Sequence, residues 1–414
     1  MSFKKIFLSF IFGVFILNPY TVFGGLAVLL LPLMSVSFLS RFRGLNCEVF
    51  FIGLSLILIS LLGVFSSVVH GIFQINHFKV AVSIVVYILL AHSIFYIFSR
   101  IGLMFDDFIH CILIAVSFNS LIIIFEIYFP SFRQMVESFL VPSGNVDWTE
   151  GFRYRGIASG GGASLSVLVP VATVLVLYLY SEKFLNVLSS FIHISILIFS
   201  VFFIGRTGLI LLPLVALFFV FFNANKYFLK IAVGAVLFGL FAFVFSGNLK
   251  QVLVDQYGMG FYNYSVGFLF SGSSGLKEDG TVGIVMEFLT VMPQAFPEVL
   301  IGYGFYGGSE FQPWTDSGYS RMFLSVGYVF GLLFYILFFM TFRNVFFYKP
   351  FLFLTIGALL LIAEAKEPLI FTGYSARLYI SILVIGLLSK RMAYRTNFQA
   401  NRSLVKVPSP MSAS

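Results

Sequence analysis

Four arginines stand out in this sequence because charge is scarce around them. Arg153 and Arg155 occur in GFRYRGIASGGG, Arg206 in IGRTGLI and Arg321 in DSGYSRMFLSVGYVF. Arginine stays protonated at physiological pH, and its planar guanidinium can donate two parallel hydrogen bonds to a phosphate group. These positions are therefore the first candidates for binding a phosphate or pyrophosphate.

A glycine run follows the first two arginines. Arg153 and Arg155 are two residues apart, so in an extended loop their side chains point the same way. Glycines 160–162 let backbone N–H groups approach an anion, and a helix is expected to begin at about Ala163, where its N-terminus favours negative charge. The competing interpretation is a pair of interfacial arginines that reach lipid headgroups.

Arg206 lies in a turn between two apolar stretches, 185–204 and 207–222. The turn is too short for the charge to move far, so we expect the guanidinium at membrane depth and directed toward protein. A cation at that depth needs a partner. A substrate anion or an internal carboxylate such as Glu364 would each meet that need, and both interpretations stay open.

A second group of residues, the candidates for substrate binding, precedes and opens a later apolar stretch. Gly302 and Gly304 form a Gly-x-Gly loop, and Asp316, Tyr319 and Arg321 follow it. Aromatic faces such as that of Tyr319 can stack on sugars, although an aromatic belt at the membrane interface explains them equally well. For Arg321, an interfacial anchor and a ligand-binding role are equally compatible with the sequence.

Carboxylates are the remaining reactive groups. One of those between residues 247 and 321 could take a proton from a sugar hydroxyl, and the sequence does not select which. The stretch AEAKEPLIFTGYSAR adds Glu364, Lys366, Glu367 and Arg377, for which internal ion pairs are the simplest interpretation.

The composition determines the surroundings of these residues. Of the 414 residues, 59% are hydrophobic and 10% charged, whereas soluble domains carry about 25% charged residues. Such a chain must use lipid as its solvent. Its apolar runs are long and continuous, which favours membrane-spanning helices over the short alternating segments of a β-barrel.

We therefore predict an all-α polytopic integral membrane protein with about twelve transmembrane helices. The net charge of +8 then reports orientation rather than nucleic-acid binding, so no nucleic-acid partner is expected. The candidate spans are 4–18, 20–39, 49–69, 78–98, 108–129, 163–181, 185–204, 207–222, 228–246, 322–342, 350–371 and 374–389.

Lysine and arginine set the expected orientation, with both termini in the cytoplasm and the short inner loops basic. The chain then divides into residues 1–246, which hold nine helices and an outer loop at 130–162, a large outer loop at 247–321, three helices in 322–390 and a cytoplasmic tail at 391–414. All four arginines fall on the outer side.

Several function classes lack their motifs. There is no G-x-x-x-x-G-K-[ST] phosphate loop, so ATP is not the expected energy source. The five histidines are scattered without a metal-binding spacing. Cys47 is predicted on the cytoplasmic side and Cys111 within a span, so the two cysteines support neither a disulfide nor a metal site. We expect no cofactor and no metal.

The order of several short motifs resembles that of the bacterial O-antigen polymerase (Wzy) family, within the O-antigen polymerase/ligase group. RYRGIASGGGASLSVLVP is similar to the family's arginine-glycine stretch before a span, and GRTGLI to its short arginine turn. PEVLIGYGFYGG with TDSGYSRMFLSVGYVFGLLF resembles its Gly-x-Gly loop and the lead into the next span, and EAKEPLIF its Lys-Glu-Pro element.

The resemblance implies a GT-C-like fold with one large periplasmic loop, in the bacterial inner membrane, and a metal-independent glycosyltransferase whose active site faces the periplasm. Its substrate would be an oligosaccharide repeat unit on undecaprenyl pyrophosphate, with membrane lipid and a chain-length regulator protein as further partners. Arg153, Arg155 and Arg206 would hold the pyrophosphates as catalytic residues, and Arg321 would bind substrate.

Two alternatives have different activities. An O-antigen ligase shares the topology and transfers the finished chain to lipid A core, but ligases of this group carry a histidine in the large outer loop, and residues 247–321 contain none. A lipid-linked oligosaccharide flippase or transporter is expected to have short loops on both sides, in contrast to the long loop here.

Overall fold

The computed structural model describes residues 2–40, 47–71, 73–141, 153–223, 289–306 and 315–404, with a few isolated positions between 251 and 262. Within these residues the protein is helical apart from one small antiparallel pair, β1 (Tyr20–Thr21) and β2 (Gly24–Gly25). The helices are α1 (Phe3–Leu17), the 3-10 helix η1 (Leu26–Leu33), α2 (Met34–Leu39), α3 (Cys47–Val69), α4 (Asn76–Arg100), α5 (Phe105–Tyr128), α6 (Pro130–Phe139), α7 (Ala163–Ser166), α8 (Leu168–Ser181), α9 (Val187–Ile204), the helix Arg206–Asn223, α14 (Glu298–Ile301), α15 (Gly318–Phe346), α16 (Pro350–Glu364) and α17 (Gly373–Leu404).

Six of the described helices are long and apolar enough to cross a membrane. The expectation of an all-α membrane protein is confirmed at this level, while the count of about twelve spans and the GT-C-like fold stay predictions. The predicted span at 228–246 and most of the large loop lie outside the described residues. The six helices are Asn76–Arg100, Phe105–Tyr128, Ala163–Ser181, Val187–Ile204, Arg206–Asn223 and Gly318–Phe346.

The predicted span at 20–39 is not one helix. Asn18 ends α1 in the left-handed conformation, and its side-chain oxygen accepts a hydrogen bond from the N–H of Ala27 at 3.0 Å. Strands β1 and β2 reverse the chain between Asn18 and Ala27, and Pro32 lies within the 3-10 helix η1 that follows. The apolar helix of Leu26–Leu39 is therefore shorter than the roughly 20 residues that a membrane crossing needs.

The last two predicted spans also end at other residues. α16 stops at Glu364 instead of continuing to 371, because the Glu364 carboxylate accepts hydrogen bonds from the N–H groups of Leu369 and Ile370 and so turns the chain back. α17 continues through Leu404, past the expected boundary at 390 and into the predicted tail.

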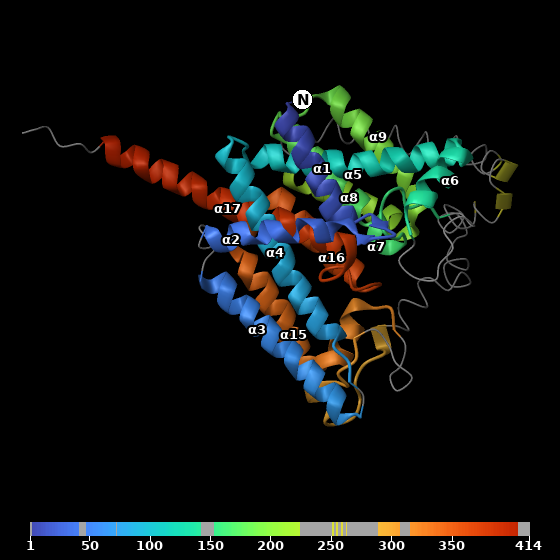
Figure 1. Ribbon diagram of the computed structural model, residues 1–414, viewed down its shortest axis with the longest axis vertical. Helices are drawn as coiled ribbons and strands as arrows, with labels where there is room; N and C mark the ends of the chain where they lie inside the picture. The colour runs from blue at the N-terminus through green and yellow to red at the C-terminus, as the bar shows by residue number, and fades with distance from the viewer. Residues whose placement is uncertain are drawn as a thin grey trace, which may run out of the picture.

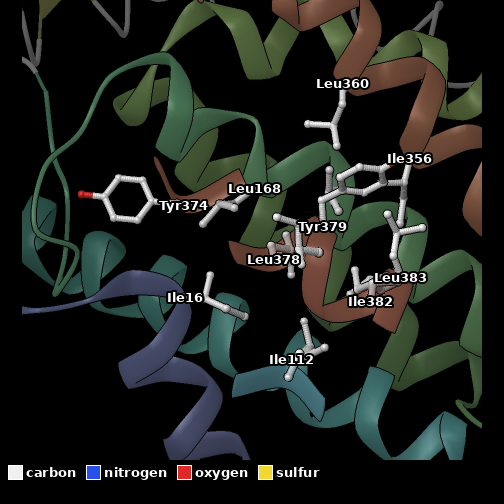
Figure 2. Close-up of a cluster of buried hydrophobic side chains, with 14 of the residues drawn as sticks. Ile16, Ile112, Leu168, Ile356, Leu360, Tyr374, Leu378, Tyr379, Ile382 and Leu383 are labelled. Atoms are coloured by element: carbon white, nitrogen blue, oxygen red, sulfur yellow. The ribbon is translucent and has the colours of Figure 1, made fainter. Parts of the chain in front are cut away.

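Helix α17 lies at the centre of the helix bundle. It contacts α1, α4, α5, α7, α8 and α15, and its colour passes through the middle of the bundle before it extends away on one side (Figure 1). Figure 2 shows α17 side chains such as Leu378, Tyr379 and Ile382 surrounded by Ile16 of α1 and Ile112 of α5. The apolar first half of α17, residues 374–389, is therefore buried on almost every side, while Met392 and Tyr394 farther along the helix are exposed.

A kink in α15 binds the loop that contains the predicted Gly-x-Gly motif. Gly327 has φ 76°, a left-handed conformation that interrupts the helix and frees carbonyls of the preceding turn. The carbonyl of Leu324 accepts a hydrogen bond from Tyr303 N–H at 2.6 Å, and that of Ser325 accepts one from Gly304 N–H at 2.9 Å. The loop therefore completes the hydrogen bonding of the kinked helix.

Replacing Gly304 with alanine is expected to destabilise the protein by about 2–3 kcal/mol, because it adds backbone strain and a clash. Gly304 has φ +81°, and a Cβ there would lie 2.2 Å from the backbone nitrogen of Ser67. Gly71 is a matched control, since its φ is +78° and its added Cβ would meet nothing within 4 Å. Thermal unfolding in detergent measures the stability of the Gly304→Ala and Gly71→Ala variants. An equal loss of stability in the two would show that the contact with Ser67 contributes nothing.

Candidate anion-binding site

A polar pocket of about 270 Å³ lies between the arginine-glycine loop, the Arg206 turn and the turn that joins α16 to α17. Three of its lining side chains are cations and one is a carboxylate. This volume is just below the roughly 300–1,000 Å³ of pockets for drug-sized ligands, so it suits a small charged group. Its lining residues are Arg153, Gly162, Ala163, Gly205, Arg206, Thr207, Lys366 and Glu367.

Two helices of spanning length begin at this pocket. Ala163 starts the helix Ala163–Ser181, as the sequence predicted, and Arg206 starts the helix Arg206–Asn223. The first N–H groups of a helix lack partners within it, and they carry the positive end of the helix dipole. The backbone therefore favours an anion in the same place as the cationic side chains.

Glycine allows these two helix ends to approach each other. A Cβ on Gly208 would lie 2.4 Å from the carbonyl oxygen of Ser166, and the Gly208 N–H donates to Ser166 Oγ at 3.2 Å. The close contact of the helix beginning at Arg206 with α7 therefore requires a residue without a side chain at position 208.

Arg153 reaches the pocket because its neighbour is bound to the end of α9. The N–H of Tyr154 donates to the carbonyl of Phe203 at 3.0 Å, and the two rings pack edge to face with centroids 5.9 Å apart. Arg133 also donates to the carbonyl of Arg153 at 3.3 Å. Since α9 ends at Ile204, these contacts bring Arg153 to the segment that begins with Arg206.

Lys366 reaches the pocket from a segment that is far from Arg153 and Arg206 in the sequence. Its Nζ donates to Thr207 Oγ1 at 3.0 Å, which ties the turn after α16 to the start of the Arg206 helix. Buried Glu364 holds this turn, because it accepts hydrogen bonds from Tyr335 Oη at 2.8 Å and from two backbone N–H groups. The sequence had considered Glu364 as a carboxylate partner for Arg206, and these bonds assign it to the turn itself.

The pocket has more positive than negative charge. Burial lowers the pKa of Lys366, and the positive charges of Arg153 and Arg206 lower it further, while Glu367 and Asp316 oppose the shift. Burial likewise raises the pKa of Glu367. An anion bound there would lie among three cationic side chains and one carboxylate.

Arg155 does not line this pocket. Its side chain is fully buried, and its Nε donates to Glu137 Oε1 at 3.1 Å while Nη2 pairs with the other carboxylate oxygen. It also donates to the carbonyls of Leu140 and Ser159. The structure therefore separates Arg155 from Arg153, which the sequence had expected to share one ligand, and gives it the role of joining α6 to the arginine-glycine loop.

Asp316, Tyr319 and Arg321 lie beside the pocket without lining it. Arg321 Nη2 pairs with Asp316 Oδ1 at 3.0 Å, and Tyr319 Oη donates to the carbonyl of Leu361 at 2.7 Å. The start of α15 touches the turn after α16, since a Cβ on Gly318 would lie 2.8 Å from Pro368 Cα. Through this contact, Asp316 and Arg321 act electrostatically on Glu367.

Gly302 and Gly304, which the sequence assigned to substrate binding, serve close packing in the structure. A Cβ on Gly302 would lie 2.5 Å from the carbonyl carbon of Ser325 in α15. Sequence analysis also treated Lys366 and Glu367 as ordinary ion-pair partners, although both line the pocket. Their only sequence signal was the EAKEPLIF stretch, because the contact with Thr207 joins residues 159 positions apart.

The lowered pKa of Lys366 predicts weaker anion binding at alkaline pH. A lysine is charged below its pKa, so a lowered value means that the charge is lost at lower pH than the usual 10.5. Titration of the whole solubilised protein with inorganic pyrophosphate at pH 7–10 should show affinity falling more steeply for the wild type than for Lys366→Arg. The probe's own ionisation affects both equally, so identical profiles would contradict the prediction.

Comparison with protein-family models, curated proteins and solved structures found no match for this chain. Within the described ranges, no group of three His, Cys, Asp or Glu side chains is arranged to hold a metal ion. The functional conclusion therefore depends on the charges and positions of the pocket residues.

Proposed function

We propose that the protein is a membrane glycosyltransferase that polymerises oligosaccharide repeat units carried on undecaprenyl pyrophosphate, at the periplasmic face of the bacterial inner membrane. The product would be an O-antigen or a similar surface polysaccharide. One observation carries the proposal: Arg153, Arg206 and Lys366 line one small pocket at the N-termini of two helices of spanning length.

The pocket fits the phosphate end of such a donor. Arginine recognises phosphate oxygens through paired hydrogen bonds, and helix N-termini bind phosphate groups through their backbone N–H groups. The volume of about 270 Å³ accommodates a charged headgroup, while the sugars and the lipid extend beyond it. Six helices of spanning length supply the membrane setting that a polyprenyl carrier requires.

The same charges would assist the reaction. When a glycosyl group is transferred, the bond from the anomeric carbon to the carrier breaks, and negative charge develops on the departing diphosphate. Fixed donors aimed at developing charge are usually the largest catalytic contribution. The donor is already activated by its diphosphate, so the transfer needs no nucleotide.

Reconstitution tests this function directly. The full-length protein in proteoliposomes is given a synthetic undecaprenyl-pyrophosphate repeat unit, with and without EDTA, and the products are separated by size. Polymer in both samples supports a metal-independent polymerase. Absence of polymer with intact, folded protein would contradict the proposal.

A genetic assay separates a polymerase from the two alternatives, a ligase and a flippase. Loss of a polymerase leaves lipopolysaccharide core capped with one repeat unit, whereas loss of a ligase or a flippase leaves bare core. Deletion of this gene is therefore expected to give the singly capped form, and bare core would favour one of the alternatives.

A further inference from the structure

Glu367 is the one carboxylate among the side chains that line the cationic pocket, whereas the other described carboxylates nearby do not line it. It follows Lys366, whose ammonium is bound to Thr207 Oγ1. In the described part of the chain, the Glu367 carboxylate makes no hydrogen bond or ion pair, although it is half-buried.

The neighbouring carboxylates already have partners. Glu364 is fully buried and accepts hydrogen bonds from Tyr335 and from the turn after α16. Asp316 pairs with Arg321, and Glu137 pairs with buried Arg155. Each of these groups stabilises a local part of the structure, whereas Glu367 lines the pocket.

We infer that Glu367 is the general base that takes the proton from the acceptor sugar hydroxyl. This inference rests on the proposed glycosyl transfer, and it places the base outside residues 247–321, where the sequence had expected it. A general base must lie within hydrogen-bond reach of the proton it removes, and Glu367 lines the same small pocket that would hold the donor's diphosphate.

The step balances without any further reactant. A Glu367 oxygen accepts the hydroxyl proton, and the acceptor oxygen forms a new bond to the anomeric carbon of the donor sugar. The bond from that carbon to the phosphate oxygen breaks, and its electron pair leaves with the diphosphate beside Arg153 and Arg206. The proton then passes from Glu367 to the diphosphate or to water, which restores the carboxylate.

The surroundings of Glu367 suit this role. Burial raises its pKa, Asp316 raises it further, and the positive charges of Lys366, Arg321 and Arg153 limit the shift. The raised pKa makes the Glu367 carboxylate a stronger base than an exposed glutamate. Proton-transfer catalysis is most efficient when the pKa of the base lies close to the working pH.

The decisive variant is Glu367→Gln, which keeps the shape and removes the basic charge. In proteoliposomes with the synthetic repeat unit, its kcat should fall by roughly 10²–10⁴, the usual contribution of a positioned general base. Binding of sugar-free undecaprenyl pyrophosphate should be unchanged or tighter, because a negative charge leaves the cationic pocket. Glu367→Asp should recover part of the turnover.

Glu298→Gln is the matched control, because Glu298 does not line the pocket and its Oε1 lies 3.6 Å from His70 Nε2. Its activity should stay near that of the wild type. The wild type should also lose kcat as the pH falls through the raised pKa of Glu367, and Glu367→Gln should lack this acid limb.

The outcomes distinguish the two proposals. If the wild type makes no polymer, the proposed function fails. If it makes polymer and Glu367→Gln keeps its kcat and acid limb, only the assignment of Glu367 fails. Equal losses of carrier binding and of turnover in Glu367→Gln would also overturn the assignment, since they indicate a role in binding rather than in proton transfer.

Discussion

Arg206→Ala is expected to lower polymerisation by roughly 10²–10³-fold, the usual cost of removing one preorganised donor from a site where charge develops. Arg206 lines the pocket at the first residue of a helix, so its guanidinium and the helix N-terminus would act on the same diphosphate. Chain length on lipopolysaccharide gels and turnover in proteoliposomes measure the effect.

Arg206→Lys separates charge from geometry. Lysine retains the positive charge but loses the planar pair of donors, so this variant should remain well below the wild type if the paired hydrogen bonds matter. Arg100→Ala is a control at the end of α4, where the arginine contacts Tyr96. Wild-type chain length in Arg206→Ala, at a normal protein level, would remove Arg206 from the active site.

Arg155→Ala is expected to destabilise the protein by about 3–5 kcal/mol, because it leaves a carboxylate with little exposure and no charged partner. Glu137 has 8% of its side chain exposed, and Arg155 has none. Thermal unfolding in detergent measures this loss. The variant would also lose activity, so activity alone does not reveal the role of Arg155.

A double substitution distinguishes packing from catalysis. Arg155→Met with Glu137→Leu removes both charges together, and apolar replacement of a buried ion pair is often neutral or stabilising. We expect this variant to recover most of the stability and to polymerise within a few-fold of the wild type. A stable double variant with no turnover would instead support the catalytic role that the sequence suggested for Arg155.

The sequence predicted single helices well and connections less well. Long apolar runs determined α4, α5 and α15 to within a few residues, since a continuous run in lipid must satisfy its own backbone hydrogen bonds. The predicted 20–39 and 350–371 spans were wrong in their extent. In each case side-chain hydrogen bonds to the backbone, from Asn18 and Glu364, turn the chain earlier than the apolar composition suggests.

For the candidate site, the residue type was informative and the spacing was not. Scarcity of charge selected Arg153 and Arg206, which the structure places in one pocket. Spacing grouped Arg155 with Arg153, but burial of Glu137 gave Arg155 a different partner. A two-residue periodicity describes a regular extended strand, and neighbouring contacts decide the direction of each side chain in a loop.

The sequence by itself determined that the chain is a helical membrane protein and selected its outer arginines as candidates, because both conclusions follow from the cost of placing polar groups in lipid. Only the tertiary structure decided which charges meet. The hydrogen bond from Lys366 to Thr207 and the pairing of Arg155 with Glu137 depend on how the helices pack. Such packing arises from shape complementarity between distant segments, which no local pattern of residues encodes.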